Sequence, residues 1–192
     1  MAQVVMDGIL IGDAETKNIM TKSSLPVGGY SVNPYVGCTH ACKYCYASFM
    51  KRFTGHTEEW GTFLDVKHWP EIKNAEKYAG QRVVIGSVTD GYNPQEEKFG
   101  NTRKLLEQLR GSGADILICT KSDLVVRDID LIKELGQVTV SWSINTLDEG
   151  FKNDMDSAVS IERRIAAMKK VYNAGIRTVC FVSPVFPGIT DF

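Results

Sequence analysis

Short apolar runs of strand length alternate with amphipathic runs of helix length along most of this 192-residue chain. Residues 82–88 are nearly continuous in apolar side chains, which is typical of strands buried on both faces. Strands are predicted at 30–36, 82–88, 115–120, 138–144 and 176–182, and helices at 48–53, 69–78, 101–110, 127–135 and 157–173. Crossover helices between such strands favour a parallel sheet with helices outside it. The predicted fold class is therefore α/β.

Polar side chains follow the end of each predicted strand. In α/β proteins the carboxyl ends of parallel strands meet at one edge, where the chemistry gathers. Along the chain these ends carry a cysteine-rich loop at 38–45, then Ser87, Thr89 and Asp90, then Lys121, then Ser143, and finally Ser183. We therefore expect a single site at this edge.

Three of the five cysteines, Cys38, Cys42 and Cys45, stand within eight residues in the spacing C-x3-C-x2-C. Three thiolates from one loop can bind three irons of a four-iron cluster and leave the fourth iron open to a ligand. The alternative is a Cys3His zinc site that includes His40, although zinc favours two separated ligand pairs. Otherwise His40 lines the cluster or is an ordinary loop residue. Cys119 and Cys180 fall in predicted apolar strands, where we expect buried, inert thiols.

The cysteine loop resembles the signature of the radical S-adenosylmethionine (SAM) superfamily, C-x3-C-x-aromatic-C, with Tyr44 in the aromatic position. The run from Asn33 to Ala47 is similar to the branch related to spore photoproduct lyase, and weaker matches follow in order at 89–97, 120–128, 143–145 and 184–191. This resemblance implies a partial parallel (β/α) barrel over residues 30–192, preceded by an N-terminal extension at 1–29. That core usually has six strand–helix units, so we expect a chain that is truncated after its fifth strand or completed by a partner.

The resemblance also implies which residues bind the cofactors. A 4Fe-4S cluster would be held by Cys38, Cys42 and Cys45. The adenine of SAM would contact the Tyr44 backbone, and its ribose would contact Ser143. Its amino group would contact Ser87, Thr89 and Asp90, and its carboxylate would contact Lys121 and Arg164.

The chemistry implied is reductive cleavage of SAM to a 5′-deoxyadenosyl radical, which abstracts hydrogen from an unidentified peptide or small molecule. A reductant such as flavodoxin or ferredoxin would supply the electron under anaerobic conditions. Two rival hypotheses are an activase that makes a glycyl radical on a partner protein, and a non-catalytic iron–sulfur or zinc protein. Spore photoproduct lyase has a hydrogen-donating cysteine where this chain has Gly86, so we do not expect that activity.

The composition supports a cytoplasmic location. The formal net charge is −1, so no global field draws the chain to nucleic acid or to an anionic membrane. No apolar run has the length of a membrane span, and the first residues have the features of neither a signal peptide nor a transit peptide.

Overall fold

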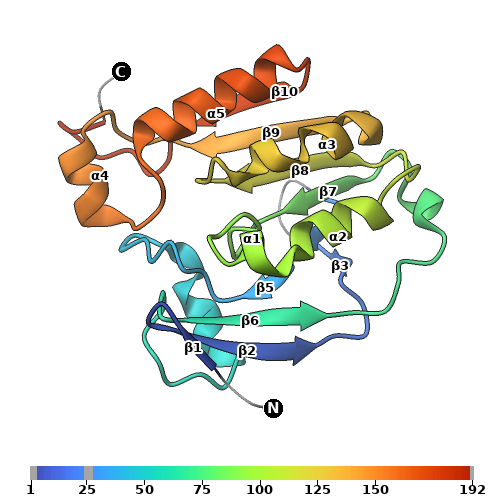
Figure 1. The fold of residues 1–192 in the computed structure, drawn as a ribbon, viewed down its shortest axis with the longest axis horizontal. Coiled ribbons are helices and arrows are strands. Elements are labelled where there is room, and N and C mark those ends of the chain that lie inside the picture. The colour runs from blue at the N-terminus through green and yellow to red at the C-terminus, as the bar shows by residue number, and fades with distance from the viewer. Residues whose placement is uncertain (1–3, 24–27, 191–192) are drawn as a thin grey trace.

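The computed structural model describes residues 4–23 and 28–190, which form two sheets with helices packed against them (Figure 1). Within the described residues, the larger sheet has the strand order β10-β9-β8-β7-β4-β3 and the smaller one the order β1-β2-β6-β5. The larger sheet consists of β3 (Thr21–Lys22), β4 (Tyr30–Val32), β7 (Arg82–Ile85), β8 (Asp115–Thr120), β9 (Val138–Ser143) and β10 (Arg177–Phe181). The smaller sheet consists of β1 (Val4–Met6), β2 (Ile9–Glu15), β5 (Tyr35–Val36) and β6 (Phe63–His68).

The strands from β4 through β10 in the larger sheet are all parallel to one another, as the alternating sequence pattern predicts. Their connections run through helices α2 (Asn101–Gln108), α3 (Ile129–Leu135) and α5 (Ile161–Asn173), which cover one face of the sheet (Figure 1). The other face is the inner side of a partial barrel. The expected α/β class and partial parallel barrel are therefore confirmed.

The two faces of β8 show how the core is divided. Ile116 and Ile118 are fully buried in the same cluster as Leu105 and Leu106 of α2. The alternate residues Leu117 and Cys119 are only partly buried and lie on the inner side of the barrel. Burial of the outer row stabilises the sheet, and the inner row remains available for a site.

Pro34 divides the predicted strand at 30–36 between the two sheets. β4 pairs with β7, whereas β5 pairs antiparallel with β6. The carbonyl of Pro34 accepts hydrogen bonds from the Lys67 backbone at 3.1 Å and from the Asn101 amide at 3.1 Å. A proline has no N–H to donate to a ladder, so the chain leaves one sheet here and enters the other.

The segment predicted as an N-terminal extension contributes strands to both sheets. β2 runs parallel to β6, and β3 pairs with β4, so the described part of residues 1–29 is built into the fold. Residues 1–3 and 24–27 of that segment lie outside the described residues, as does Asp191 of the C-terminal match. The small sheet is absent from the sequence prediction.

The shorter helices differ most from the prediction. They are η1 (Tyr46–Phe53), η2 (Ala75–Tyr78), α1 (Glu96–Phe99), η3 (Leu124–Asp128) and α4 (Glu149–Met155). Of the helix predicted at 69–78, only the last turn forms. The helix predicted from 157 begins at Ile161, because the Ser160 hydroxyl caps it by accepting from the Arg163 N–H at 3.2 Å.

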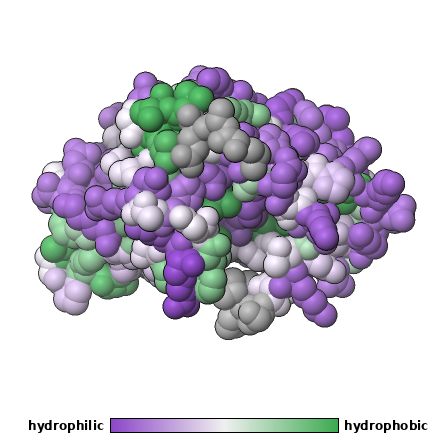
Figure 2. Space-filling model, turned by 90° about the horizontal axis from the view of Figure 1, so that it is seen from below, coloured by the Kyte–Doolittle hydropathy of each residue, from purple (hydrophilic) through white to green (hydrophobic). Residues whose placement is uncertain are grey.

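None of the helices in the described ranges is long and apolar enough to cross a membrane. The face seen from below in Figure 2 is mainly hydrophilic, and its hydrophobic side chains form separate patches.

His56 links the loop after η1 to β6. Its Nδ1 lies 2.9 Å from Glu58 Oε2, its Nε2 lies 3.0 Å from Asp65 Oδ2, and its ring stacks on Phe63 at 3.9 Å between centroids. Burial lowers the pKa of His56, but the hydrogen bonds to Asp65 and Glu58 outweigh burial, and the pKa lies above its ordinary value. The protonated ring therefore favours the folded state.

Replacing His56 with Phe tests this link through its pH dependence. Because the pKa is raised on folding, the stabilisation is fully present below the unfolded pKa of about 6.5 and is lost as pH rises through the folded pKa. Urea unfolding from about pH 6 to about pH 9 should show the stability difference between wild type and His56→Phe shrinking as pH rises. A difference that does not change with pH would contradict the prediction.

Candidate functional site

A cavity of about 320 Å³ lies at the carboxyl ends of β7 to β10, a volume suited to a small-molecule site. It is lined by every predicted site residue except Arg164, namely Cys38, Cys42, Tyr44, Cys45, Ser87, Thr89, Asp90, Lys121 and Ser143. The structure thus brings together residues that are more than one hundred positions apart in the sequence. The predicted residues, Arg164 apart, therefore share one cavity at this edge of the sheet.

Hydrogen bonds from three sides hold the cysteine loop in place. On the β7 side, Thr89 Oγ1 donates to the Gly37 carbonyl at 2.5 Å. Thr39 Oγ1 donates to the Gln95 side chain at 2.7 Å. On the α4 side, the Ser157 N–H donates to the His40 carbonyl at 2.8 Å. These bonds tie the loop to the segment after β7, to Gln95 before α1 and to the segment after α4.

The three loop cysteines are free thiols that face the same cavity. Burial raises the pKa of Cys38 well above its usual range and raises that of Cys42 to about 11, with nearby Lys121 opposing the shift at Cys42. Both thiols are therefore protonated at neutral pH, and metal binding would release their protons.

The donor set, three thiols of one loop on one cavity, fits a four-iron cluster. Within the described ranges, no three His, Cys, Asp or Glu side chains converge closely enough to hold one metal ion. A cubane cluster distributes its thiolates over different irons, so its ligands stand farther apart. Beside the cysteines, His40 Nδ1 is buried without a hydrogen-bond partner among the described residues, which is consistent with a site that receives a further group.

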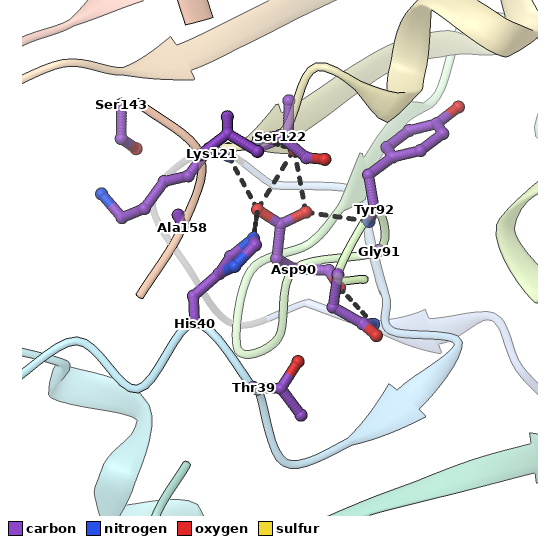
Figure 3. Close-up of polar contacts among 12 residues, drawn as sticks. Thr39, His40, Asp90, Gly91, Tyr92, Lys121, Ser122, Ser143 and Ala158 are labelled. Carbon is purple, nitrogen blue, oxygen red and sulfur yellow. Dashed lines mark hydrogen bonds and ion pairs between the residues drawn. The ribbon is translucent and has the colours of Figure 1, made fainter. Parts of the chain in front are cut away.

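Of the alternatives that the sequence leaves open for His40, the structure does not favour an ordinary loop residue, because His40 lines the cavity with the cysteines. It is 2% exposed, and its Nε2 lies 3.0 Å from Asp90 Oδ2 (Figure 3). Burial raises the pKa of Asp90, but the charge and hydrogen bond of His40 and the N–H groups of Lys121 and Tyr92 outweigh burial and hold it below its ordinary value. Asp90 is therefore an ionised carboxylate surrounded by donors from the protein.

Two predicted SAM contacts, Lys121 and Ser87, line the cavity but differ in how their side chains are engaged. Lys121 Nζ stands 5.3 Å from the centroid of the Tyr44 ring, a cation–π distance. Ser87 Oγ is 2.5 Å from Ser31 Oγ and accepts from the Asn33 amide at 3.1 Å. Lys121 thus offers its charge to the cavity, whereas Ser87 is already engaged with its own neighbours.

The structure does not bring Arg164 to the cavity. Its side chain is 1% exposed, and Nη2 forms an ion pair with Asp156 Oδ1 at 2.7 Å. Nε and Nη1 donate to the carbonyls of Val159 and Ser143 at 2.9 and 3.2 Å. The ion pair with Asp156 holds the guanidinium away from the cavity, and its hydrogen bond to the Ser143 carbonyl stabilises the end of β9.

The two outlying cysteines are not buried core thiols as expected. Cys119 lines the cavity, because β8 alternates and Ile118 and Thr120 take the buried outer positions. Burial, with a smaller contribution from Asp90, raises the pKa of Cys119 to about 11. Cys180 is exposed on β10. Tyr46 and Phe181 also line the cavity and were missed, since nothing in their local pattern distinguishes them from packing aromatics.

Gly86 faces a backbone atom that leaves no room for a side chain. Its φ is +89°, and a Cβ built there would stand 2.6 Å from the Cys119 carbonyl oxygen. Gly100 has a similar φ of +62° but open space around it. A side chain at position 86 would therefore require the Cys119 carbonyl or the chain at Gly86 to shift.

A pair of glycine substitutions separates these two effects. Gly100→Ala should destabilise the fold by about 1–2 kcal/mol, the cost of a left-handed backbone for a residue with a Cβ. Gly86→Ala should cost more, because the Cys119 carbonyl must also move. Urea unfolding of both variants measures the difference, and equal midpoints would show that the carbonyl yields freely.

A parallel α/β partial barrel with a three-cysteine loop at the carboxyl ends of its strands defines the class of this protein. The sequence profile described as the Radical SAM superfamily matches residues 32–192, and the chain belongs to that superfamily.

Known relatives and structures agree with this assignment. Protein MJ0683 of Methanocaldococcus jannaschii is 37% identical over 180 residues, which cover 92% of this chain and 68% of the relative. The radical SAM Nα-GlyT isomerase of Pseudomonas phage M6 is 26% identical over 167 residues, covering 85% of this chain and 33% of the phage protein. Spore photoproduct lyase complexed with dinucleoside spore photoproduct has the same fold, with a TM-score of 0.68 at 20% identity over 92% of this chain. The chain spans about half of that structure, 51% of its length.

Proposed function

We propose that this protein uses a 4Fe-4S cluster on Cys38, Cys42 and Cys45 to cleave SAM reductively. The observation that carries the proposal is that all three thiols line one cavity together with Lys121 and Ser143 at the strand ends. When bound, the cluster and SAM supply a 5′-deoxyadenosyl radical, which abstracts hydrogen from the substrate. A spore photoproduct lyase variant of similar fold, with a TM-score of 0.67, has been solved with bound AdoMet.

In this proposal the residues of this chain bind the cluster and SAM and orient them. Lys121 gives the cavity a cationic group suited to the carboxylate of SAM. Ser143 offers a hydroxyl to the ribose, and the backbone of Tyr44 meets the adenine. Thr89 holds the loop through Gly37, and Arg164 fixes the backbone of Ser143 rather than contacting SAM.

The substrate and the electron donor are further parts of the proposal. We favour a peptide or small molecule as substrate, a donor such as flavodoxin or ferredoxin, and anaerobic conditions in the cytoplasm. The formal charge of −1 offers little neutralisation for the phosphates of a duplex. Among the similar proteins, one is named as an isomerase of Nα-GlyT and another is solved with a dinucleoside, so small nucleoside derivatives belong in a substrate screen.

The cluster can be tested by anaerobic reconstitution. The protein should bind about four irons per chain and form 5′-deoxyadenosine from SAM and dithionite. Cys42→Ala should lose the intact cluster, because each thiolate holds its own iron. Cys180→Ala, on the exposed strand β10, is the matched control and should keep the cluster. A tightly bound zinc without iron–sulfur absorbance would contradict the proposal, and a stable cluster that never cleaves SAM would favour a non-catalytic protein.

The role of Lys121 can be tested by SAM affinity. Lys121→Ala should weaken SAM binding by about 10- to 150-fold, the equivalent of roughly 1.5–3 kcal/mol for a charge-assisted hydrogen bond. Isothermal titration calorimetry of the reconstituted protein measures this change, and the iron content should not change. Lys43→Ala is the control, because Lys43 is exposed in the same loop. An unchanged affinity in Lys121→Ala would remove Lys121 from the site.

A further inference from the structure

One buried carboxylate connects the cysteine loop to the ends of two strands. Asp90 follows β7 and is 7% exposed. Its carboxylate forms a hydrogen bond with Nε2 of His40, in the middle of the cysteine loop, at 3.0 Å (Figure 3). It also accepts a hydrogen bond from the N–H of Lys121, at the end of β8, at 2.7 Å. Three segments that are separate in sequence therefore meet at one side chain.

The hydrogen-bonding capacity of this carboxylate is filled by the protein itself. Besides His40 and Lys121, it accepts from the Tyr92 N–H at 2.8 Å and from Thr120 Oγ1 at 2.9 Å. A carboxylate offers about four lone-pair positions, so four protein donors leave none for a ligand. Direct contact with the amino group of SAM, the role that the resemblance implies for Asp90, would require breaking one of these bonds.

His40 depends on Asp90 for its orientation. The imidazole is 2% exposed, and Nε2 makes its only described hydrogen bond, because Nδ1 has no partner among the described residues. His40 stands between Cys38 and Cys42, and its ring lines the same cavity as both thiols. The position of the ring and the path of the loop are therefore set together.

We propose that His40 and Asp90 are positioning residues that fix the cysteine loop against the ends of β7 and β8 before any cluster binds. The same carboxylate holds the backbone of Lys121, so the pair also couples the position of the loop to the SAM side of the cavity. The fixed loop is a property of the metal-free protein, whereas the coupling to the SAM side rests on the proposed function.

Hydrogen–deuterium exchange of the metal-free protein tests whether His40 and Asp90 fix the loop. Asp90→Asn and His40→Ala should each speed exchange across residues 37–45 by about tenfold or more, because a hydrogen bond to a buried charge is lost. In residues 37–45 the double variant should exchange little faster than either single variant, since both changes remove the same hydrogen bond between His40 and Asp90. His40→Gln offers an N–H in place of Nε2 and should restore protection in part.

Asp128→Asn is the matched control for neutralising a buried carboxylate. Asp128 is 0% exposed and bonds to Arg103, Arg127 and the Tyr92 hydroxyl, none of which lies in or next to residues 37–45. Its exchange pattern in the loop should equal that of wild type. Unchanged protection in both Asp90→Asn and His40→Ala would overturn the proposal. Should Asp90→Asn fail to fold, the His40 variants decide alone.

Reconstituted protein separates positioning from direct contact. If Asp90 contacts SAM, Asp90→Asn should lose SAM affinity while His40→Ala, which leaves the carboxylate intact, should bind normally. Positioning predicts that both variants lose iron occupancy and both weaken the change that SAM causes in the electron paramagnetic resonance spectrum of the reduced cluster. Normal behaviour of His40→Ala would overturn the coupling. If the wild-type protein binds neither iron nor SAM, the proposed function is refuted. The exchange experiment would still show whether His40 and Asp90 fix the loop.

Discussion

The parallel hydrogen-bonding register from β7 to β10 is the constraint on which the rest of this structure depends. It pairs Ile85 with Ile118, Cys119 with Ser141, and Ser143 with Phe181, so one row of side chains faces the helices and the next faces the cavity. A shift of one residue would exchange these rows. The core and the site are therefore specified by the same ladder.

Buried carboxylates provide the second level of organisation around the cavity. Glu96 accepts from the Tyr35 hydroxyl at 2.5 Å and from the Thr102 N–H at 2.8 Å. Asp156 holds Arg164 at 2.7 Å and accepts from the Tyr44 hydroxyl at 3.3 Å. A buried charge is tolerated only when its hydrogen bonds are made, so each carboxylate fixes the segments that supply its donors. In this way loops without regular structure acquire defined positions.

Much of this arrangement could be predicted from the sequence. Continuous apolar runs marked the strands from β7 to β10, and the cysteine spacing marked the loop. The small sheet could not be found in this way, because β6 places Asp65 and Lys67 among its apolar residues and β1 and β2 are short or flanked by charge. Sequence could also not tell which face of an apolar strand meets helices, so Cys119 was expected to be a buried thiol although it lines the cavity. Arg164 was misplaced because its partner Asp156 lies on another segment.

The division of the chain at Pro34 has a consequence for how the protein matures. The cysteine loop follows β5 directly, and β4 and β5 belong to different sheets whose partners, β7 and β6, come later in the sequence. The loop can take its final path only after both pairings have formed, and such distant contacts are acquired slowly during folding. Small metal-binding domains fold around their metal. Under the proposed function we expect the reverse order here, with a folded scaffold presenting the thiols before iron arrives.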